Sequence, residues 1–299
     1  FFKQKTAYEL MPSLVGSEMC IRDRDIADVD DDGTAEIVAG GSGDSTGGQD
    51  TYREWLLAIR TSDGAAFQEE LYQHLDHGDG TERLMDLAVA DVDDDGTQEI
   101  VATGYSKDTG VTRTVLRIMT WDGGTTLTTE HVTTFDVGDE DYLHRLAVAD
   151  VDGDGRKEIV LAGRARMSAT FDWYVRVLRW DGASLEFVAD KTWSFGDDAI
   201  IQAVAVTDVD RDGQAEVLLA GHANLEAVPG ATGGFGYIHY YADWYLKVMS
   251  LSDTTWTEET ARQWASSRDY DTNDNGQPDP GDEGALGRLY DMDAGDLDG

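Results

Sequence analysis

One stretch of the chain decides the fold: Ala90-Asp91-Val92-Asp93-Asp94-Asp95-Gly96-Thr97-Gln98-Glu99-Ile100. Copies with the same spacing of acidic residues begin at Asp28, Asp91, Asp150, Asp208 and Asp296. They are separated by 63, 59, 58 and 88 residues, and the last copy stops at Gly299. A long, nearly regular period is typical of proteins built from stacked supersecondary units. We therefore expect a repeat protein whose chain is cut inside its fifth repeat.

Short strand patterns surround each acidic loop. In the second unit, Leu87–Ala90 leads into the loop and Glu99–Ala102 leads out of it. A third strand is predicted at Val115–Met119 and ends at the turn Trp121-Asp122-Gly123, and a fourth is predicted at Leu127–Phe135. No stretch of the chain shows sustained helical periodicity. Each repeat therefore consists of four short strands.

Four strands in each repeat predict the blade of a β-propeller. The third unit has the same pattern, with a strand at Val175–Leu178 and the turn Trp180-Asp181-Gly182. We predict an all-β fold over residues 25–299, a β-propeller fragment of about four four-stranded blades and the start of a fifth. The alternative is an all-β sandwich, which would not require the same acidic motif in every unit.

The acidic loop has the pattern of a calcium site. Carboxylates at positions 1, 3 and 5 converge in a tight loop, glycine at position 6 permits the turn, position 7 offers a backbone carbonyl, and position 9 adds a carboxylate. An EF-hand would need Glu at position 12, where this chain has Ala or Leu. The alternative is a set of solvated acidic turns. The predicted ligands are Asp28, Asp30, Asp32, Thr34 and Glu36; Asp91, Asp93, Asp95, Thr97 and Glu99; Asp150, Asp152, Asp154, Arg156 and Glu158; Asp208, Asp210, Asp212, Gln214 and Glu216; and Asp296 and Asp298.

The motif Asp-x-Asp-x-Asp-Gly-x-x-(Asp/Glu) between two strands, repeated about every 60 residues, resembles the FG-GAP/VCBS repeats of integrin α-subunits and of many secreted bacterial and archaeal proteins. The Phe-Gly and Gly-Ala-Pro signatures of the family are not clear here, so the bacterial VCBS-like branch is the better match. The resemblance implies structural calcium in each loop, ligands on the opposite face of the propeller, and a secreted or cell-surface location.

The chain is strongly acidic. It has 299 residues with 60 acidic and 23 basic side chains, a formal net charge of -37. Such a charge disfavours nucleic acid and anionic membranes as partners and favours cations. A salt-rich habitat is an alternative source of the acidity, but many of the Asp residues lie in the repeated motifs. No apolar run approaches the roughly 20 residues of a membrane span.

Residues 1–24 differ from the rest of the chain. Lys3–Glu9 and Leu14–Asp23 correspond to the translation of a DNA sequencing adapter, and we expect the segment to be non-native. We therefore expect the genuine blade to start near Asp25 and the preceding residues not to form a blade strand. Cys20, the single cysteine, lies in this segment, so cysteine usage indicates nothing about the compartment.

The fourth unit carries two insertions, one before its third strand and one after its fourth. The second contains another motif of the calcium type, with predicted ligands Asp271, Asn273, Asn275 and Asp279; the alternative is a polar loop without metal. The first is aromatic, and such rings stack on sugars or anchor protein partners. We predict that both insertions lie opposite the calcium loops and form a patch for a protein or carbohydrate ligand. The candidate contacts are Phe235, Tyr237, His239, Tyr240, Tyr241 and Trp244, of which some could instead pack within the strand.

We expect a calcium-binding module for adhesion, recognition or scaffolding, and not an enzyme. The alternative is the propeller of a calcium-dependent polysaccharide lyase, such as a rhamnogalacturonan lyase, or of another carbohydrate-active enzyme. That reading would need a catalytic base in a cleft, and the nearest candidate is His74-x-Asp76-His77, which we interpret as a linking loop. We expect Trp121 and Trp180 to pack in the turns that they begin.

Overall fold

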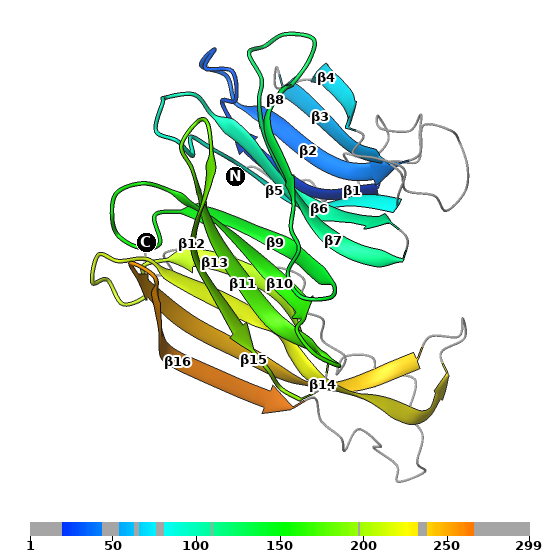
Figure 1. The fold of residues 1–299 in the computed structure, drawn as a ribbon. Helices are drawn as coiled ribbons and strands as arrows, with labels where there is room; N and C mark the ends of the chain where they lie inside the picture. Colours follow the sequence, from blue (N-terminus) through cyan, green and yellow to red (C-terminus); the bar gives the residue numbers. More distant parts are fainter. Residues whose placement is uncertain are drawn as a thin grey trace. The chain divides into compact units, whose positions relative to one another are not determined.

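The computed structural model describes residues 20–43, 54–62, 66–75, 81–108, 110–196, 198–232 and 238–265. The chain divides into two compact units, Phe1–Phe135 and Asp136–Gly299, and each is considered by itself. The described residues form strands, turns and bends (Figure 1). Within this part of the chain there is no helix that is long and apolar enough to cross a membrane.

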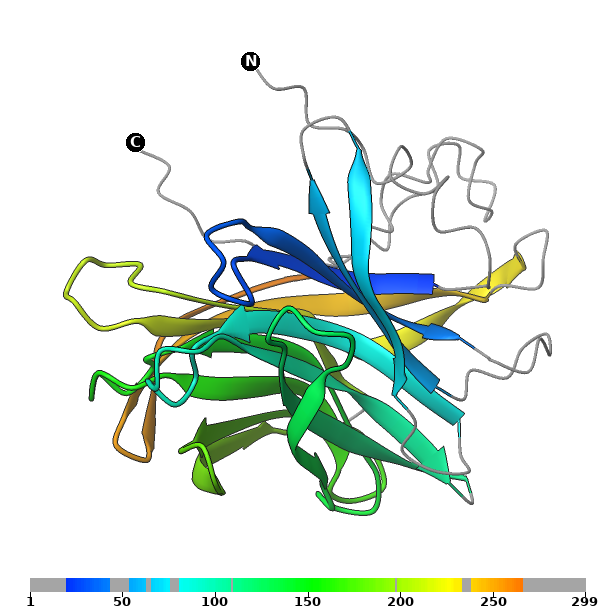
Figure 2. The ribbon, with the colours of Figure 1, turned by 90° about the horizontal axis from the view of Figure 1, so that it is seen from above.

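The first unit contains two antiparallel sheets of four strands, and the strands of each sheet follow one another in chain order. Each sheet is strongly twisted when it is seen from above (Figure 2), as expected for antiparallel strands. The first sheet consists of β1 (Cys20–Ala27), β2 (Glu36–Gly43), β3 (Glu54–Ser62) and β4 (Phe67–Leu75). The second consists of β5 (Thr81–Ala90), β6 (Glu99–Asp108), β7 (Val111–Thr120) and β8 (Thr128–Thr134).

The second unit repeats this topology with two further sheets. One consists of β9 (Asp141–Ala149), β10 (Glu158–Arg166), β11 (Phe171–Trp180) and β12 (Leu185–Trp193). The other consists of β13 (Ile200–Thr207), β14 (Glu216–Thr232), β15 (Ile238–Ser252) and β16 (Thr255–Ala265). The prediction of an all-β fold made of four-stranded units is thus confirmed. The fifth copy, at Asp296–Gly299, lies outside the described residues.

Each unit has a core shared by its two sheets. In the first unit, Trp55 and Ile59 of β3 belong to the same buried cluster as Leu84 of β5 and Ile100 of β6. The second unit has an equivalent cluster, in which side chains of β10 and β11 join those of β13 and β14. Sheets that bury apolar faces against their neighbours are what stacked repeats require. The central strands β2, β3, β10 and β11 are accordingly buried over most of their length, whereas the outer strand β8 is largely exposed.

Every first strand contains a bulge at the same place. The register shifts five residues before the first aspartate of each loop, at Ile21/Asp23 in β1 and at Leu84/Asp86 in β5. The second strand has a glycine opposite each bulge; at Gly104, a Cβ would overlap the carbonyl oxygen of Arg83. The glycine therefore permits the close approach that the bulge creates. The four glycines are Gly41, Gly104, Gly163 and Gly221.

The predicted start of the first blade was wrong in one respect. Strand β1 begins at Cys20, not near Asp25, and Arg24 pairs with Ala39 of β2. Backbone pairing with β2 extends the strand to Cys20, and the carboxylate of Asp23 also accepts a hydrogen bond from the N–H of Leu87 at 2.9 Å, whereas the side chains of Arg22 and Arg24 are exposed. Residues 1–19 lie outside the described part of the chain, and the origin of the segment stays a prediction.

Candidate metal centres

The four acidic loops share one hydrogen-bond pattern. In the second loop, the carboxylate of Asp91 accepts a hydrogen bond from the backbone N–H of Gly96 at 3.1 Å. Asp95 accepts one from Thr97 at 2.7 Å, and Glu99 accepts one from Val92 at 2.8 Å. The same bonds recur at the corresponding residues of the other three loops. These bonds hold the loop closed and leave further carboxylate oxygens for a cation.

Two positions of each loop have left-handed backbone conformations. Position 6 is always glycine, as predicted, with φ of 96° at Gly96. Position 4 also has a positive φ, of 62° at Asp94 and 78° at Gly153. The motif alone did not predict this conformation. Asp and Gly tolerate this conformation better than most residues.

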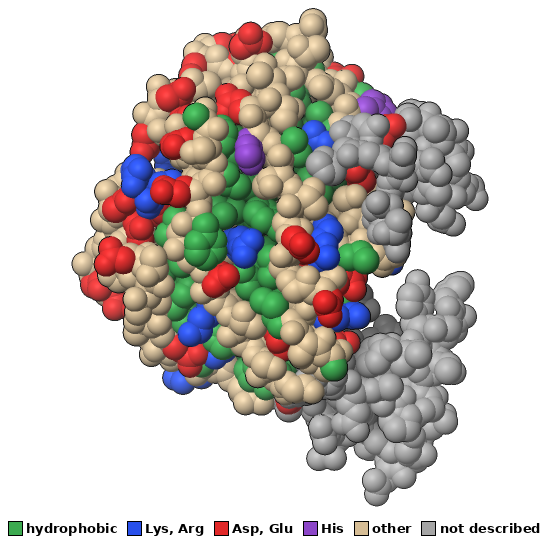
Figure 3. All heavy atoms as spheres, in the orientation of Figure 1, with side chains coloured by type: hydrophobic (Ala, Val, Ile, Leu, Met, Phe, Trp, Pro, Cys, Tyr) green, Lys and Arg blue, Asp and Glu red, His purple; other side chains and the backbone are tan. Residues whose placement is uncertain are grey.

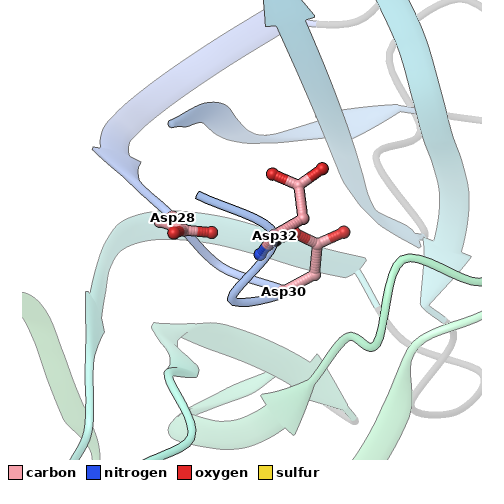
Figure 4. Close-up of side chains that lie close together, drawn as sticks. All are labelled: Asp28, Asp30 and Asp32. Atoms are coloured by element: carbon pink, nitrogen blue, oxygen red, sulfur yellow. Dashed lines mark hydrogen bonds between the residues drawn. The ribbon is translucent and has the colours of Figure 1, made fainter. Parts of the chain in front are cut away.

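The carboxylates of each loop lie close together (Figure 4 shows the side chains of Asp28, Asp30 and Asp32). One oxygen from each of three residues lies within 4.8 Å of the others, which is close enough for one metal ion to reach all three. Such sets of hard oxygen donors suit calcium or another hard divalent cation. The four sets are Asp28, Asp30 and Asp32; Asp91, Asp93 and Glu99; Asp150, Asp152 and Glu158; and Asp208, Asp210 and Glu216.

The first loop contains buried oxygens that no protein group satisfies. Glu36 is 1% exposed, and its Oε2 accepts a hydrogen bond from the N–H of Val29 at 2.9 Å, but its Oε1 has no partner. Oδ1 of Asp28 is also buried without a partner. A buried oxygen without a partner is costly, and a bound cation would remove that cost.

The glutamate at position 9 is held in an unfavourable charge environment. Burial, with the negative charges of Asp93 and Glu130, raises the pKa of Glu99 to about 7. Burial raises the pKa of Glu36 and of Glu216 in the same way. A cation in these loops would stabilise the charged carboxylates. The loops thus contain buried, mutually repelling carboxylates whose charges a metal ion would neutralise.

The third loop differs because it contains a side-chain cation. Nη2 of Arg179, on β11, lies 3.0 Å from Asp152 and 3.0 Å from Asp154, and it also pairs with Glu158. Burial raises the pKa of Glu158, and the hydrogen bond from Arg179 opposes that rise. The sequence analysis missed Arg179, because it lies on a later strand of the repeat.

The residues at position 7 donate their backbone N–H groups to the aspartate at position 5, and a metal ligand from their carbonyls stays a prediction. Among their side chains, that of Arg156 pairs with Asp154 at 3.1 Å and that of Gln214 donates to the carbonyl of Leu251 at 2.6 Å. The guanidinium of Arg156 is a further positive charge beside the third loop. Acidic side chains are scattered over the face drawn in Figure 3, among fewer Lys and Arg side chains.

The structure describes only some of the other candidate residues. The second acidic motif, from Asp271 to Asp279, lies outside the described residues, as do Phe235, Tyr237, Asp296 and Asp298. The backbone of His239, Tyr240 and Tyr241 belongs to β15, and their side chains are not described. Trp244 is partly buried and makes an edge contact with His222, at 5.3 Å between ring centroids. The predicted ligand patch therefore stays a prediction.

The remaining motif residues have structural partners. His74 lies on β4, and its Nδ1 is 2.5 Å from Glu54, whereas Asp76 and His77 lie outside the described residues. Trp121 and Trp180 are both 2% exposed, which confirms that they pack inside the turns. Asp181 accepts hydrogen bonds from Ala183 and Ser184, as expected of a turn residue.

Comparison with known families gives one match. Residues 91–161 match the family model of the FG-GAP-like repeat. The matched stretch begins at the first aspartate of the second loop, includes the third loop, and ends in β10. The predicted resemblance is confirmed for this stretch. No curated protein matches the chain.

Proposed function

We propose that the chain is a calcium-binding module of a secreted or cell-surface protein, which binds a protein or a carbohydrate and does no chemistry of its own. Calcium in the acidic loops has a structural role in this proposal, since it neutralises the carboxylates and fixes the connection between the first two strands of a sheet. The resemblance of residues 91–161 to FG-GAP-like repeats supports the proposal.

The single observation that carries the proposal is that the carboxylate of Glu36 is buried with one oxygen unpaired. This carboxylate is 1% exposed, accepts one hydrogen bond through Oε2, and leaves Oε1 buried without a partner beside the converging carboxylates of Asp28, Asp30 and Asp32. If the loop were only a solvated acidic turn, the side chain of Glu36 would be exposed to water. A cation with six to eight oxygen ligands is the simplest partner for such an arrangement.

The place for a ligand follows from the hairpin of β14 and β15. These strands have 17 and 15 residues and continue past the rest of their sheet (Figure 1). Strand β14 begins where the loop Asp208–Glu216 ends, and its pairing with β15 reaches Thr232 at its other end, which supports a ligand surface away from the metal. We infer that the aromatic residues of this hairpin contact the ligand, away from the metal.

We propose an extracellular location, which the resemblance to FG-GAP-like repeats implies and the open acidic loops support. Extracellular calcium modules bind with dissociation constants of about 0.1 to 1 mM, which only the calcium outside cells satisfies. Loops that are open on one side, such as Asp208–Glu216 with Asp208 and Asp210 exposed, fit this class better than a high-affinity buffer.

Thermal melting of the chain with calcium, with magnesium and with a chelator tests the proposal. Each ion that binds only the folded state stabilises it, by about 2.7 kcal/mol at a calcium concentration 100 times the dissociation constant. We expect a clear calcium-dependent increase in the melting temperature, and a smaller one in Asp93→Ala. A midpoint that ignores calcium, or that magnesium raises equally, would contradict structural calcium.

A further inference from the structure

The residue opposite the glutamate of the loop differs in the third sheet. Glu99 of β6 pairs with Thr120 of β7, and the register of β10 and β11 brings Glu158 opposite Arg179. Cross-strand partners have their side chains on the same face of the sheet. In chain order, the four residues at this position are Thr61, Thr120, Arg179 and Ser250. Three of the sheets therefore have a hydroxyl where the third has a guanidinium.

A second position changes together with the first. The fourth strand of each sheet has a bulge beside this site, and the bulged residues are Glu70, Glu130, Val188 and Glu259. Thr61 donates a hydrogen bond to Glu70 at 2.6 Å, and Thr120 donates one to Glu130 at 3.2 Å. The third sheet thus replaces a hydroxyl and a glutamate by an arginine and a valine. This exchange makes the surroundings of the third loop more positive by two charges.

The three glutamates act on the carboxylates of their loops. Burial comes first among the causes that raise the pKa of Asp30, Glu99 and Glu216, and the negative charges of Glu70, Glu130 and Glu259 respectively add to it. A fourth-strand glutamate therefore makes each of these loops more favourable for a cation. The apolar Val188 has no such effect on the third loop.

In the third loop, Arg179 bonds the glutamate oxygen whose equivalent in the first loop has no partner. Oε1 of Glu36 has no hydrogen bond, whereas Oε1 of Glu158 accepts from Nε of Arg179 at 2.9 Å and from Nη2. Nη2 of Arg179 also donates to Asp152 at 3.0 Å. The side chains of Arg179, Asp152 and Glu158 are 10%, 8% and 0% exposed. This arginine is therefore enclosed among the carboxylates and is not a surface ion pair.

We propose that Arg179 is the built-in cation of the third loop, so that this loop is ordered without metal and binds calcium much more weakly than the second loop does. The inference rests on the proposed calcium function of the other loops. Arg179 pairs with Asp152 and Glu158, which are two of the three carboxylates that could hold a metal ion in this loop, and a guanidinium and a divalent ion at the same carboxylates would repel each other. Calcium could enter only after Arg179 had left its buried partners.

Two reciprocal variants of the full chain test the proposal by calorimetric titration with calcium. R179T/V188E gives the third sheet the residues of the second, and we expect it to bind one more calcium ion than the unchanged chain. T120R/E130V gives the second sheet the residues of the third, and we expect the affinity of one site to fall by at least about tenfold. R176T is the matched control, since Arg176 lies on the same strand and pairs with Asp190, and it should leave the titration unchanged.

The outcomes separate this inference from the function on which it rests. If the unchanged chain binds calcium but neither exchange alters the number or affinity of the sites, Arg179 is not the cation of the third loop. If the unchanged chain binds no calcium, the proposed function fails. In that case melting in chelator decides the inference: R179T/V188E should melt lower and T120R/E130V higher than the unchanged chain, and equal midpoints would overturn it.

Discussion

The second and third acidic loops have nearly the same backbone and the same set of carboxylates, yet they differ in charge. Gly96 and Gly155 have φ of 96° and 92°, and Glu99 and Glu158 accept the same backbone hydrogen bond. The second loop, however, faces Glu130, whereas the third encloses Arg179. The comparison teaches that the nine-residue motif defines the shape of the loop, and that residues on the third and fourth strands define its charge.

The largest expected difference concerns the glutamate at position 9. Glu158→Gln leaves Arg179 with two carboxylates of the three, and we expect a loss of about 2 kcal/mol in the free energy of unfolding, because a buried charge loses a partner. The loss should be equal with calcium and with chelator. Chemical denaturation in the two conditions measures it.

Glu99→Gln is the matched variant in the second loop. It removes a buried negative charge that has no arginine beside it, so we expect no loss of stability in chelator and a loss only in calcium. A calcium-dependent loss in Glu158→Gln, or a loss in chelator for Glu99→Gln, would remove the distinction between the two loops.

A smaller effect is expected at position 4, where the second loop has Asp94 and the third has Gly153. Both residues have positive φ, and an alanine is disfavoured there. Gly153→Ala should cost about 1 to 2 kcal/mol with and without calcium, whereas Asp94→Gly should be close to neutral. Urea denaturation of both variants decides the point, and a neutral Gly153→Ala would show that the backbone of the third loop is less constrained than its φ indicates.

The smallest effect concerns pH. The pKa of His144 is lowered to about 3. Burial is the main cause, and the positive charges of Arg145 and Arg164 add to it. Hydrogen bonds with Tyr142 and Gln202 oppose the shift. Between pH 6.5 and 3 the unfolded chain therefore binds a proton that the folded chain does not, and stability falls as the pH falls. The loss at pH 6 is about 1 kcal/mol.

His144→Gln should reduce this dependence in melting curves recorded between pH 8 and pH 5.5. His222 has a pKa lowered to about 4 by burial, with the charge of Arg164 adding to it, so part of the dependence should persist. Comparisons between the two loops are therefore best made above pH 7. An acid dependence unchanged in His144→Gln would show that the pKa of this histidine is not lowered in the folded chain.

Much of the fold followed from the sequence because its determinants are local. The predicted strand Val115–Met119 lies inside β7, and Leu87–Ala90 is the end of β5. The glycine at position 6 and the carboxylates around it were likewise visible in a nine-residue motif. The start of β1 was not, because it is set by pairing with β2, a strand that lies later in the chain.

The charge of the third loop could not be read from its motif. Arg179 and Glu158 are far apart in sequence, and the pairing of β10 with β11 brings them together. Val188 lies beside the site because of the bulge in β12. An alignment of the four repeats by strand register contains the signal, since a single arginine occupies a column of hydroxyl residues. Sequence spacing alone does not give that register.

The bulge that recurs in the first strand of every sheet has a consequence for how such chains assemble. The segment Cys20–Arg24 has only an apolar residue before the bulge in common with all the other first strands, and it adopts the bulge at the same place, opposite Gly41 of β2. The second strand therefore acts as the template, and its glycine dictates the alignment of whatever segment pairs with it. A repeat array built in this way can exchange, lose or acquire first strands between repeats, or even between molecules, and each newcomer would still enter in the correct register.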